Sequence, residues 1–256
     1  MILDYLKYLF RAGNEHSLHS PFMFDFYLKV LQNQDNKDEF ERIEALREAL
    51  LKDKREIEIT DFGAGSKVNQ SNLRKIKDIA RNSQKSSKLA QLFYRIIRRY
   101  NYTYILDLGT SLGITTTYLA SANPKAKVYT FEGCPQTARV AQENFEKLKI
   151  ENVDIVVGDL SQTLQQQLEK TDKIDFAFFD ANHRYEPTVD YFEKCLTKAH
   201  EDTCFIFDDI YWSDGMKQAW EHIRNHPRST ITIDIFHVGI VFFRSKQPKQ
   251  HFVLKF

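Results

Sequence analysis

Apolar and polar residues recur with two different periods along the chain, and the change of period divides it in two. Over residues 2–10, 39–51 and 87–100, apolar residues fall at helical spacing, which predicts amphipathic helices. From residue 104 onward, short apolar runs alternate with helical stretches, as in strands joined by crossover helices. We therefore expect a mostly helical appendage over residues 1–100 and an α/β domain over residues 101–256.

Seven apolar runs predict the strands of the α/β domain. They are residues 104–108, 127–131, 153–157, 174–179, 204–207, 230–236 and 238–243. The link between the last two is too short to contain a crossover, so these two strands must pair antiparallel. The pattern predicts a Rossmann-like, doubly wound sheet of seven strands, with an antiparallel last strand and the helical appendage at the start of the chain.

The first predicted strand runs into a turn that contains two glycines. Residues 104–113 read Tyr-Ile-Leu-Asp-Leu-Gly-Thr-Ser-Leu-Gly, which places Gly109 and Gly113 four apart. A dinucleotide-binding turn has the pattern G-x-G-x-x-G, whereas position 111 is Ser here. Asp107, two residues before the first glycine, could attract a cationic group of a ligand. The turn alone does not distinguish a ligand site from a plain strand-to-helix connection.

Acidic residues stand at the ends of the first five predicted strands. They are Asp107, Glu132, Asp159, Asp180 and Asp208. Ligands of open α/β sheets bind outside the carboxyl ends of the strands. Asp is common in turns, so one or two acids could fall there by chance, but five are harder to dismiss. Glu132 is placed to accept ribose hydroxyls, and Gly158 with Asp159 to bind an adenine amino group.

This succession over residues 100–245 resembles the class I S-adenosylmethionine-dependent methyltransferases. The turn with the pattern acid-x-Gly-x-x-x-Gly resembles the first motif of that family. The resemblance implies that S-adenosylmethionine is the cofactor. It implies a cofactor site made of Asp107, Gly109, Thr110, Ser111, Gly113, Glu132, Gly158 and Asp159.

A second motif resembles the metal-dependent O-methyltransferases of sugars and natural products, and more distantly the catechol-type enzymes. Residues 180–186 read Asp-Ala-Asn-His-Arg-Tyr-Glu, and Phe207 is followed by two aspartates. The resemblance implies Mg²⁺ ligands at Asp180, Asp208 and Asp209, and carboxylates suit this hard ion. The chain departs from the pattern at Ala181, where the family has Gly, and at Asp209, where the catechol group has Asn.

His183 stands where the catechol group has Lys, which leaves the identity of the catalytic base open. Its reference pKa lies nearest neutrality, so it suits a general base for a substrate hydroxyl. Alternatively, it only makes hydrogen bonds in the turn. With His183 and Asp180 as catalytic residues, we expect Mg²⁺-assisted O-methylation of a small-molecule hydroxyl, with residues 1–100 covering the pocket and selecting the acceptor. The sequence does not identify the acceptor.

Other functions stay open at this point. A metal-independent methyltransferase would rely on His183, and a nicotinamide-dependent oxidoreductase would use the same fold. A non-catalytic module could bind nucleic acid through the basic stretch 67–99, although 67–88 lacks interleaved aromatic residues, so a solvated surface is the simpler interpretation. The glycine-rich segment 61–66 is interpreted as a loop that could face the pocket. His16 and His19 are interpreted as capping and packing residues, because no cysteine or carboxylate pair completes a metal site.

Composition narrows the cellular setting. The formal net charge is +1, and the three cysteines are widely spaced, which indicates reduced thiols and neither a disulfide framework nor a zinc site. The apolar stretch at the start is broken by Asp4 and Lys7, and no signal-peptide layout is evident. We expect a soluble, cytoplasmic protein that binds a small-molecule acceptor but neither nucleic acid nor a membrane, with a homodimer left open.

Overall fold

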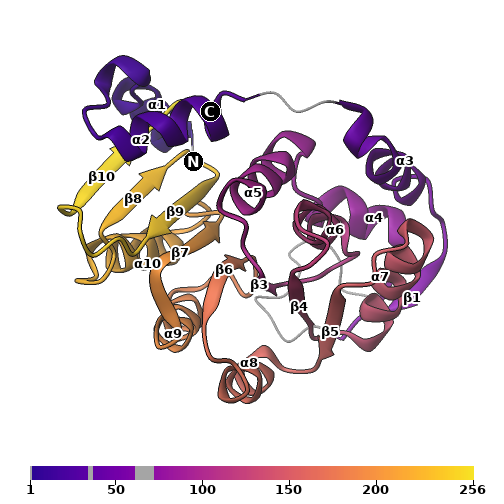
Figure 1. Cartoon of the computed structure of the whole chain (residues 1–256). Coiled ribbons are helices and arrows are strands. Elements are labelled where there is room, and N and C mark those ends of the chain that lie inside the picture. Colours follow the sequence, from indigo (N-terminus) through magenta and orange to yellow (C-terminus); the bar gives the residue numbers. More distant parts are fainter. Residues whose placement is uncertain (1, 34–36, 61–71) are drawn as a thin grey trace. The chain divides into compact units, whose positions relative to one another are not determined.

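The computed structural model describes residues 2–33, 37–60 and 72–256 (Figure 1). Backbone contacts divide the chain into two compact units. The first, called the glycine-turn unit, comprises Gln34–Leu164. The second, called the two-segment unit, joins Met1–Asn33 to Gln165–Phe256. Each unit contains residues from both sides of the predicted domain boundary at residue 100. The role of residues 1–100 as a substrate cap stays a prediction.

Three parallel strands form the centre of the glycine-turn unit. They lie in the order β3 (Tyr104–Leu108), β4 (Lys127–Glu132) and β5 (Val153–Val157). Helix α6 (Ile114–Ala122) connects β3 to β4, and α7 (Pro135–Leu148) connects β4 to β5. Helix α8 (Leu160–Glu169) begins directly after β5 and spans the boundary between the units. Helices that connect neighbouring parallel strands are what the alternating apolar pattern predicts.

The residues before β3 are helical with one small hairpin. A 3₁₀ turn, η3 (Lys37–Phe40), leads into α3 (Glu41–Leu50). Strands β1 (Glu56–Glu58) and β2 (Leu73–Lys75) pair antiparallel, and α4 (Ile76–Ser83) and α5 (Ser87–Tyr100) follow. Helix α5 has the predicted bounds: the Ser86 hydroxyl accepts a hydrogen bond from the Leu89 N–H at its start, and Asn101 ends it in the left-handed conformation.

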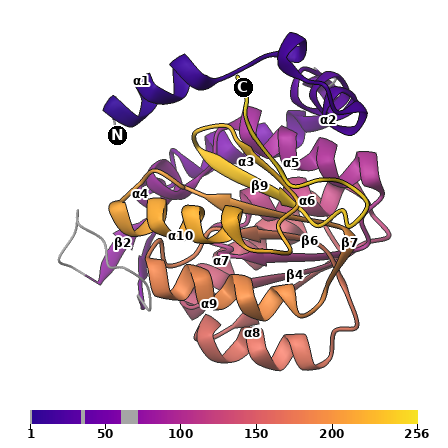
Figure 2. The same cartoon turned by 90° about the vertical axis from the view of Figure 1, so that its left-hand side faces the viewer.

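The two-segment unit contains five strands in the order β10-β8-β9-β7-β6. Their bounds are β6 (Ile174–Phe179), β7 (Ala199–Asp208), β8 (Ile231–Asp234), β9 (Val238–Phe242) and β10 (Gln250–Val253). Strand β9 is antiparallel to both β7 and β8, whereas the pairs β6–β7 and β8–β10 are parallel. Helices α9 (Tyr185–Leu196) and α10 (Asp214–Asn225) lie side by side in this unit (Figure 2).

The start of the chain packs within the same unit as its end. Helix α1 (Ile2–Arg11), a 3₁₀ turn η1 (Glu15–Ser17), α2 (Pro21–Phe26) and a π-helical turn η2 (Tyr27–Leu31) form this segment. The hydroxyl of Tyr8 donates to the carbonyl of Leu254 at 2.6 Å, and its ring packs on that of Phe236. The rings of Phe22 and Phe26 contact the ring of Phe242 edge to face. These contacts tie the first thirty residues to the last two strands.

The Rossmann-like α/β fold and the antiparallel strand β9 are confirmed, but the predicted number of strands is wrong. The described residues contain an eighth strand, β10, beside β8, in addition to the β1–β2 hairpin. Three helices, α2, α4 and α8, were not predicted either. The stretch interpreted as a basic loop surface forms β2 and α4 where it is described, and the glycine-rich segment 61–66 lies outside the described residues.

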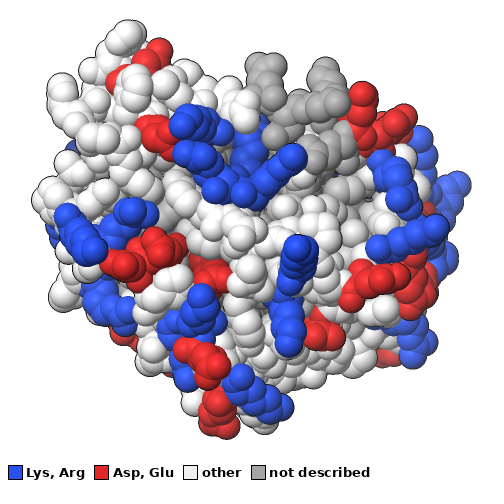
Figure 3. Space-filling view, in the orientation of Figure 1, with Lys and Arg blue, Asp and Glu red and all other residues white. Residues whose placement is uncertain are grey.

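Two general features bear on the expected partners. Within the described residues, no helix combines the length and apolarity needed to cross a membrane. Basic and acidic side chains both occur across the face shown in Figure 3, in keeping with the net charge of +1.

Candidate functional site

The glycine turn after β3 depends on backbone conformations that side chains disfavour. Gly109 has φ 126° and Gly113 has φ 79°, and Ser111 between them lies in the left-handed region at φ 48°. A Cβ at Gly113 would stand 2.7 Å from a ring carbon of Phe145 in α7. Glycine at this position therefore meets both a conformational and a packing requirement. Gly113 is the N-cap of α6, so the turn presents the N-terminal end of that helix.

Asp107 is fully buried inside β3 and does not lie at its exposed end. Its Oδ2 accepts hydrogen bonds from the hydroxyls of Thr116 (2.6 Å) and Thr130 (2.9 Å). Its Oδ1 is buried without a hydrogen-bond partner among the described residues. Burial raises the pKa of this carboxyl to about 6, although the two threonine hydroxyls oppose the shift. Thr110, also buried, shares a hydrogen bond with the Thr130 hydroxyl at 2.6 Å.

Glu132, the last residue of β4, has its carboxylate fixed by the backbone of two turns. Oε2 accepts from the N–H of Ser111 and Oε1 from the N–H of Cys134, both at 2.9 Å. The carbonyl of Glu132 accepts from the N–H of Gly158, which has φ 138° and follows β5. The acidic residue thus connects the ends of three adjacent strands.

Asp159 directly precedes helix α8. Its Oδ1 accepts from the N–H of Ser161 at 2.9 Å, and its carbonyl accepts from the N–H groups of Gln162 and Thr163. This is a helix-capping role that the sequence analysis did not consider. All eight predicted cofactor residues nevertheless lie in β3, at the ends of β4 and β5, or in the turns that follow these three strands.

Two residues from the preceding helical segment reach this region and were not predicted. The hydroxyl of Ser83, the last residue of α4, lies 2.7 Å from that of Ser111. The positive charge of Lys85 is among the groups that lower the pKa of Asp107, an effect smaller than that of burial. Both residues precede the motif by more than 20 positions, so no local pattern could have indicated them.

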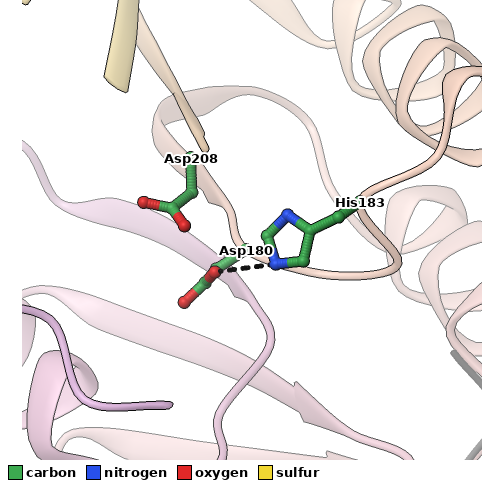
Figure 4. Close-up of side chains that lie close together, drawn as sticks. All are labelled: Asp180, His183 and Asp208. Carbon is green, nitrogen blue, oxygen red and sulfur yellow. Dashed lines mark ion pairs between the residues drawn. The ribbon is translucent and has the colours of Figure 1, made fainter. Parts of the chain in front are cut away.

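A second cluster forms in the two-segment unit, where Asp180, His183 and Asp208 converge (Figure 4). Asp180 directly follows β6, and Asp208 is the last residue of β7. One potential ligand atom from each side chain lies within 4.8 Å of the others. Nε2 of His183 is 3.5 Å from Oδ1 of Asp180. Asp208 is buried, whereas the His183 side chain keeps 27% of its surface exposed.

The loop that carries His183 has an unusual backbone. The N–H of His183 donates to the carbonyl of Ala181 at 3.0 Å and closes a three-residue turn around Asn182, which has φ 67°. The side chain of Arg184 donates to the Asn182 side-chain oxygen at 2.7 and 2.9 Å. A turn of this kind is rare and strained. Its effect here is to bring the imidazole back toward Asp180.

The structure brings together two of the three predicted metal ligands. Asp180 and Asp208 belong to the cluster with His183, which was predicted as a base, whereas Asp209 does not belong to it. Asp209 has φ 52°, and its N–H donates to the carbonyl of His237. Among the described residues, His16 and His19 are not part of a group that could hold a metal.

The chain is similar in sequence to known methyltransferases. Residues 106–210 match a family described as "Methyltransferase domain". An O-methyltransferase, imqG, of Aspergillus flavus is 29% identical over 48% of this chain and 51% of its own length. A catechol O-methyltransferase of Niastella koreensis is 30% identical over 50% of this chain and 57% of its own length. The chain thus spans about half the length of the curated relatives it matches.

Solved structures share the fold at low sequence identity. An O-methyltransferase from Bacillus cereus, in complex with S-adenosylhomocysteine, is 20% identical, with a TM-score of 0.56 over 86% of this chain and 97% of that one. TomG from Streptomyces achromogenes, in complex with S-adenosylmethionine, is 16% identical, with a TM-score of 0.58 over 87% of this chain and 96% of that one. The region that matches the methyltransferase-domain family contains both the glycine turn and the Asp180 cluster, and the solved O-methyltransferase structures share the fold of this chain.

Proposed function

We propose that this protein is an S-adenosylmethionine-dependent O-methyltransferase that uses Mg²⁺ to methylate a hydroxyl group of a small molecule. The observation that carries the proposal is the convergence of Asp180, His183 and Asp208 after two adjacent parallel strands. Two carboxylates and an imidazole at such a place combine metal-ligating and proton-accepting groups. The names of the curated relatives support O-methylation as the reaction.

The glycine-turn unit fits the proposed cofactor. S-adenosylmethionine supplies the methyl group, and both its sulfonium and its ammonium are positively charged. Oδ1 of Asp107, which has no hydrogen-bond partner among the described residues, places negative charge beneath the turn, and this favours a cationic ligand there. The backbone N–H groups that hold Glu132 orient its carboxylate for ribose hydroxyls, and Asp159 would accept from the adenine amino group.

The donor set of the second cluster fits a divalent cation. Asp180 and Asp208 would hold Mg²⁺ through carboxylate oxygens, which this ion prefers, and Asp209 stays the proposed third ligand. When bound, the ion supplies positive charge that lowers the pKa of an acceptor hydroxyl. Without a cation, two carboxylates this close would repel each other, which is a cost that a merely structural cluster would have no reason to keep.

His183 would take the proton of the acceptor hydroxyl. Its side chain is partly exposed, so an acceptor can reach it, and the carboxylate of Asp180 at 3.5 Å favours the imidazolium formed by proton transfer. Asp180 thus has a positioning role for the base in addition to its proposed role as a metal ligand. The strained turn at Asn182 holds the ring in this place.

The remaining parts of the proposal concern the selection of the acceptor and the cellular location. Residues 1–100 would select the acceptor. The three cysteines, Cys134, Cys195 and Cys204, are free and buried, which suits the reducing cytoplasm.

Calorimetry combined with a methyl-transfer assay tests the proposal. We expect S-adenosylhomocysteine to bind, and transfer to catechol-type or sugar hydroxyls to require Mg²⁺ and to stop with EDTA. The variant His183→Gln should lose transfer but keep S-adenosylhomocysteine affinity, whereas His16→Gln, at a side chain 84% exposed, should behave as wild type. Transfer that is insensitive to EDTA would indicate a metal-independent enzyme relying on His183. Tight NADH binding without S-adenosylhomocysteine binding would refute the cofactor assignment.

A further inference from the structure

Helix α1 has three distinct sides, and one of them is apolar and exposed. Tyr8 is buried against the two-segment unit, and Tyr5 packs on Phe236 beside it. Asp4, Lys7 and Arg11 form a narrow polar strip. The third side carries large apolar residues with these exposed fractions: Ile2 80%, Leu3 72%, Leu6 47%, Leu9 42% and Phe10 92%.

The inner side of α1 is fixed, so this outer side is a stable surface of the unit. Tyr8 donates to the Leu254 carbonyl, Asp4 lies 3.5 Å from the ammonium of Lys217, and the N–H of Gly13 donates to the Val253 carbonyl at 2.9 Å. Turning the helix to bury its outer side would break these contacts. The exposed stripe therefore stays available to a partner molecule.

The size of the stripe matches a protein interface. If a fully exposed large apolar side chain presents on the order of 150–200 Å², the five residues present roughly 500–650 Å². The largest apolar patch on a typical monomer is about 300–600 Å². Two such stripes facing each other would remove roughly 1,000–1,300 Å² from water, which clears the ~1,000 Å² expected of a specific interface.

We propose that a second copy of this chain covers the stripe, through antiparallel packing of two α1 helices about a two-fold axis at Leu6. In this arrangement Leu6 meets its own copy, Ile2 faces Phe10 of the partner copy, and Leu3 faces Leu9. Every large apolar residue thus meets another, as an isologous interface requires. The polar strip points away from the axis. This inference does not depend on the proposed methyl transfer.

The charges of α1 favour a protein partner over a membrane surface. Helices that lie on membranes carry many Lys and Arg residues on their polar side. The strip on α1 has two basic residues and one acid, which amounts to a net charge of only +1.

Sedimentation velocity tests the proposal. The wild-type protein should be a dimer, and Leu6→Glu should raise the dimer dissociation constant at least 100-fold, because two carboxylates would meet at the axis. Since Leu6 is half exposed, the variant should still fold, with the far-UV circular dichroism spectrum of the wild type. The matched control is Leu73→Glu, at a leucine 57% exposed on β2, which should stay dimeric.

A mixing experiment identifies the molecule that covers the apolar stripe of α1. Leu6→Glu and Leu6→Lys should each be monomeric alone and form a heterodimer when mixed, because only a two-fold axis at this residue brings the two charges together. A wild-type protein that stays monomeric into the high micromolar range would overturn the proposal. A dimer that Leu6→Glu leaves intact would do the same. A monomer that cosediments with phosphatidylcholine–phosphatidylserine vesicles would also overturn the proposal.

Discussion

Replacing Asp208 by Asn should abolish the stabilisation that Mg²⁺ gives to the folded protein, and should stabilise the metal-free form. The ligand atoms of Asp180 and Asp208 lie within 4.8 Å of each other. At an effective dielectric constant of about 20, two charges at this distance repel by about 3 kcal/mol. Asn removes the repulsion while it keeps the size of the side chain, so the metal-free variant should melt at or above the wild-type temperature.

The same variant should lose the stabilisation that Mg²⁺ gives to the wild-type protein. A ligand at a concentration 100 times its Kd stabilises the folded state by about 2.7 kcal/mol. For a protein of this size, that corresponds to a rise in Tm of about 5–10 °C. We expect this rise in the wild type on addition of MgCl₂, its reversal by EDTA, and its loss in Asp208→Asn. Differential scanning calorimetry measures both quantities in one experiment.

Asp202→Asn is the matched control for this prediction. Asp202 lies on the same strand, β7, but its side chain is 67% exposed and lies 3.7 Å from Arg244. This control should keep the full response to Mg²⁺, and both variants should bind S-adenosylhomocysteine as the wild type does. A variant Asp208→Asn that melts lower without metal and still responds fully to Mg²⁺ would show that Asp208 has a structural role and does not bind the ion.

Three further predictions concern the glycine-turn unit. Glu132→Ala should weaken S-adenosylmethionine binding by about 1.5–3 kcal/mol, the range for a charge-assisted hydrogen bond, and unchanged affinity in calorimetry would refute the ribose assignment. Gly113→Ala should lower the free energy of unfolding, measured by chemical denaturation, by about 2–4 kcal/mol, because a left-handed backbone and a ring 2.7 Å away both oppose a Cβ. Adding Phe145→Leu to this variant should recover part of the loss, and full additivity of the two substitutions would contradict the contact. The pKa of Asp107 is raised to about 6 in the folded state, so between about pH 4 and pH 6 the folded protein holds more protons than the unfolded chain and stability falls as pH rises, by up to about 3 kcal/mol. Asp107→Asn should flatten this part of the stability profile, and an unchanged slope would refute the assignment.

Local patterns were sufficient for the central strands but not for the edges of the fold. Buried parallel strands are nearly continuous apolar runs, and β6, in which every residue is buried, is easily recognised as one. Strand β10 has four residues and begins with Gln250 and His251, so only its pairing with β8 distinguishes it from a loop. Helix α8 has apolar residues only at 160, 164 and 168, which is too sparse a stripe to stand out.

The same limit applies to the candidate site. That Asp180 and Asp208 lie close together could be predicted, because they stand at the ends of two parallel strands, and these strands are neighbours in the sheet. That the cluster contains His183 and not Asp209 could not be predicted. It depends on left-handed backbone conformations at Asn182 and Asp209, which the residue types do not dictate. Ser83 was missed for another reason: its contact with Ser111 joins segments 28 residues apart.

The packing of α1 against the last strand also sets an order in which the protein can be made. The hydrogen bond between Tyr8 and Leu254 joins residues 246 positions apart. At about 5–20 residues per second, α1 leaves the ribosome roughly 10–50 s before its partner strand exists. The glycine-turn unit, by contrast, is one continuous segment and can complete its contacts during synthesis. During that interval the aromatic and aliphatic sides of α1 are both open to solvent. A chaperone that binds α1 would therefore have most effect before the final strand appears.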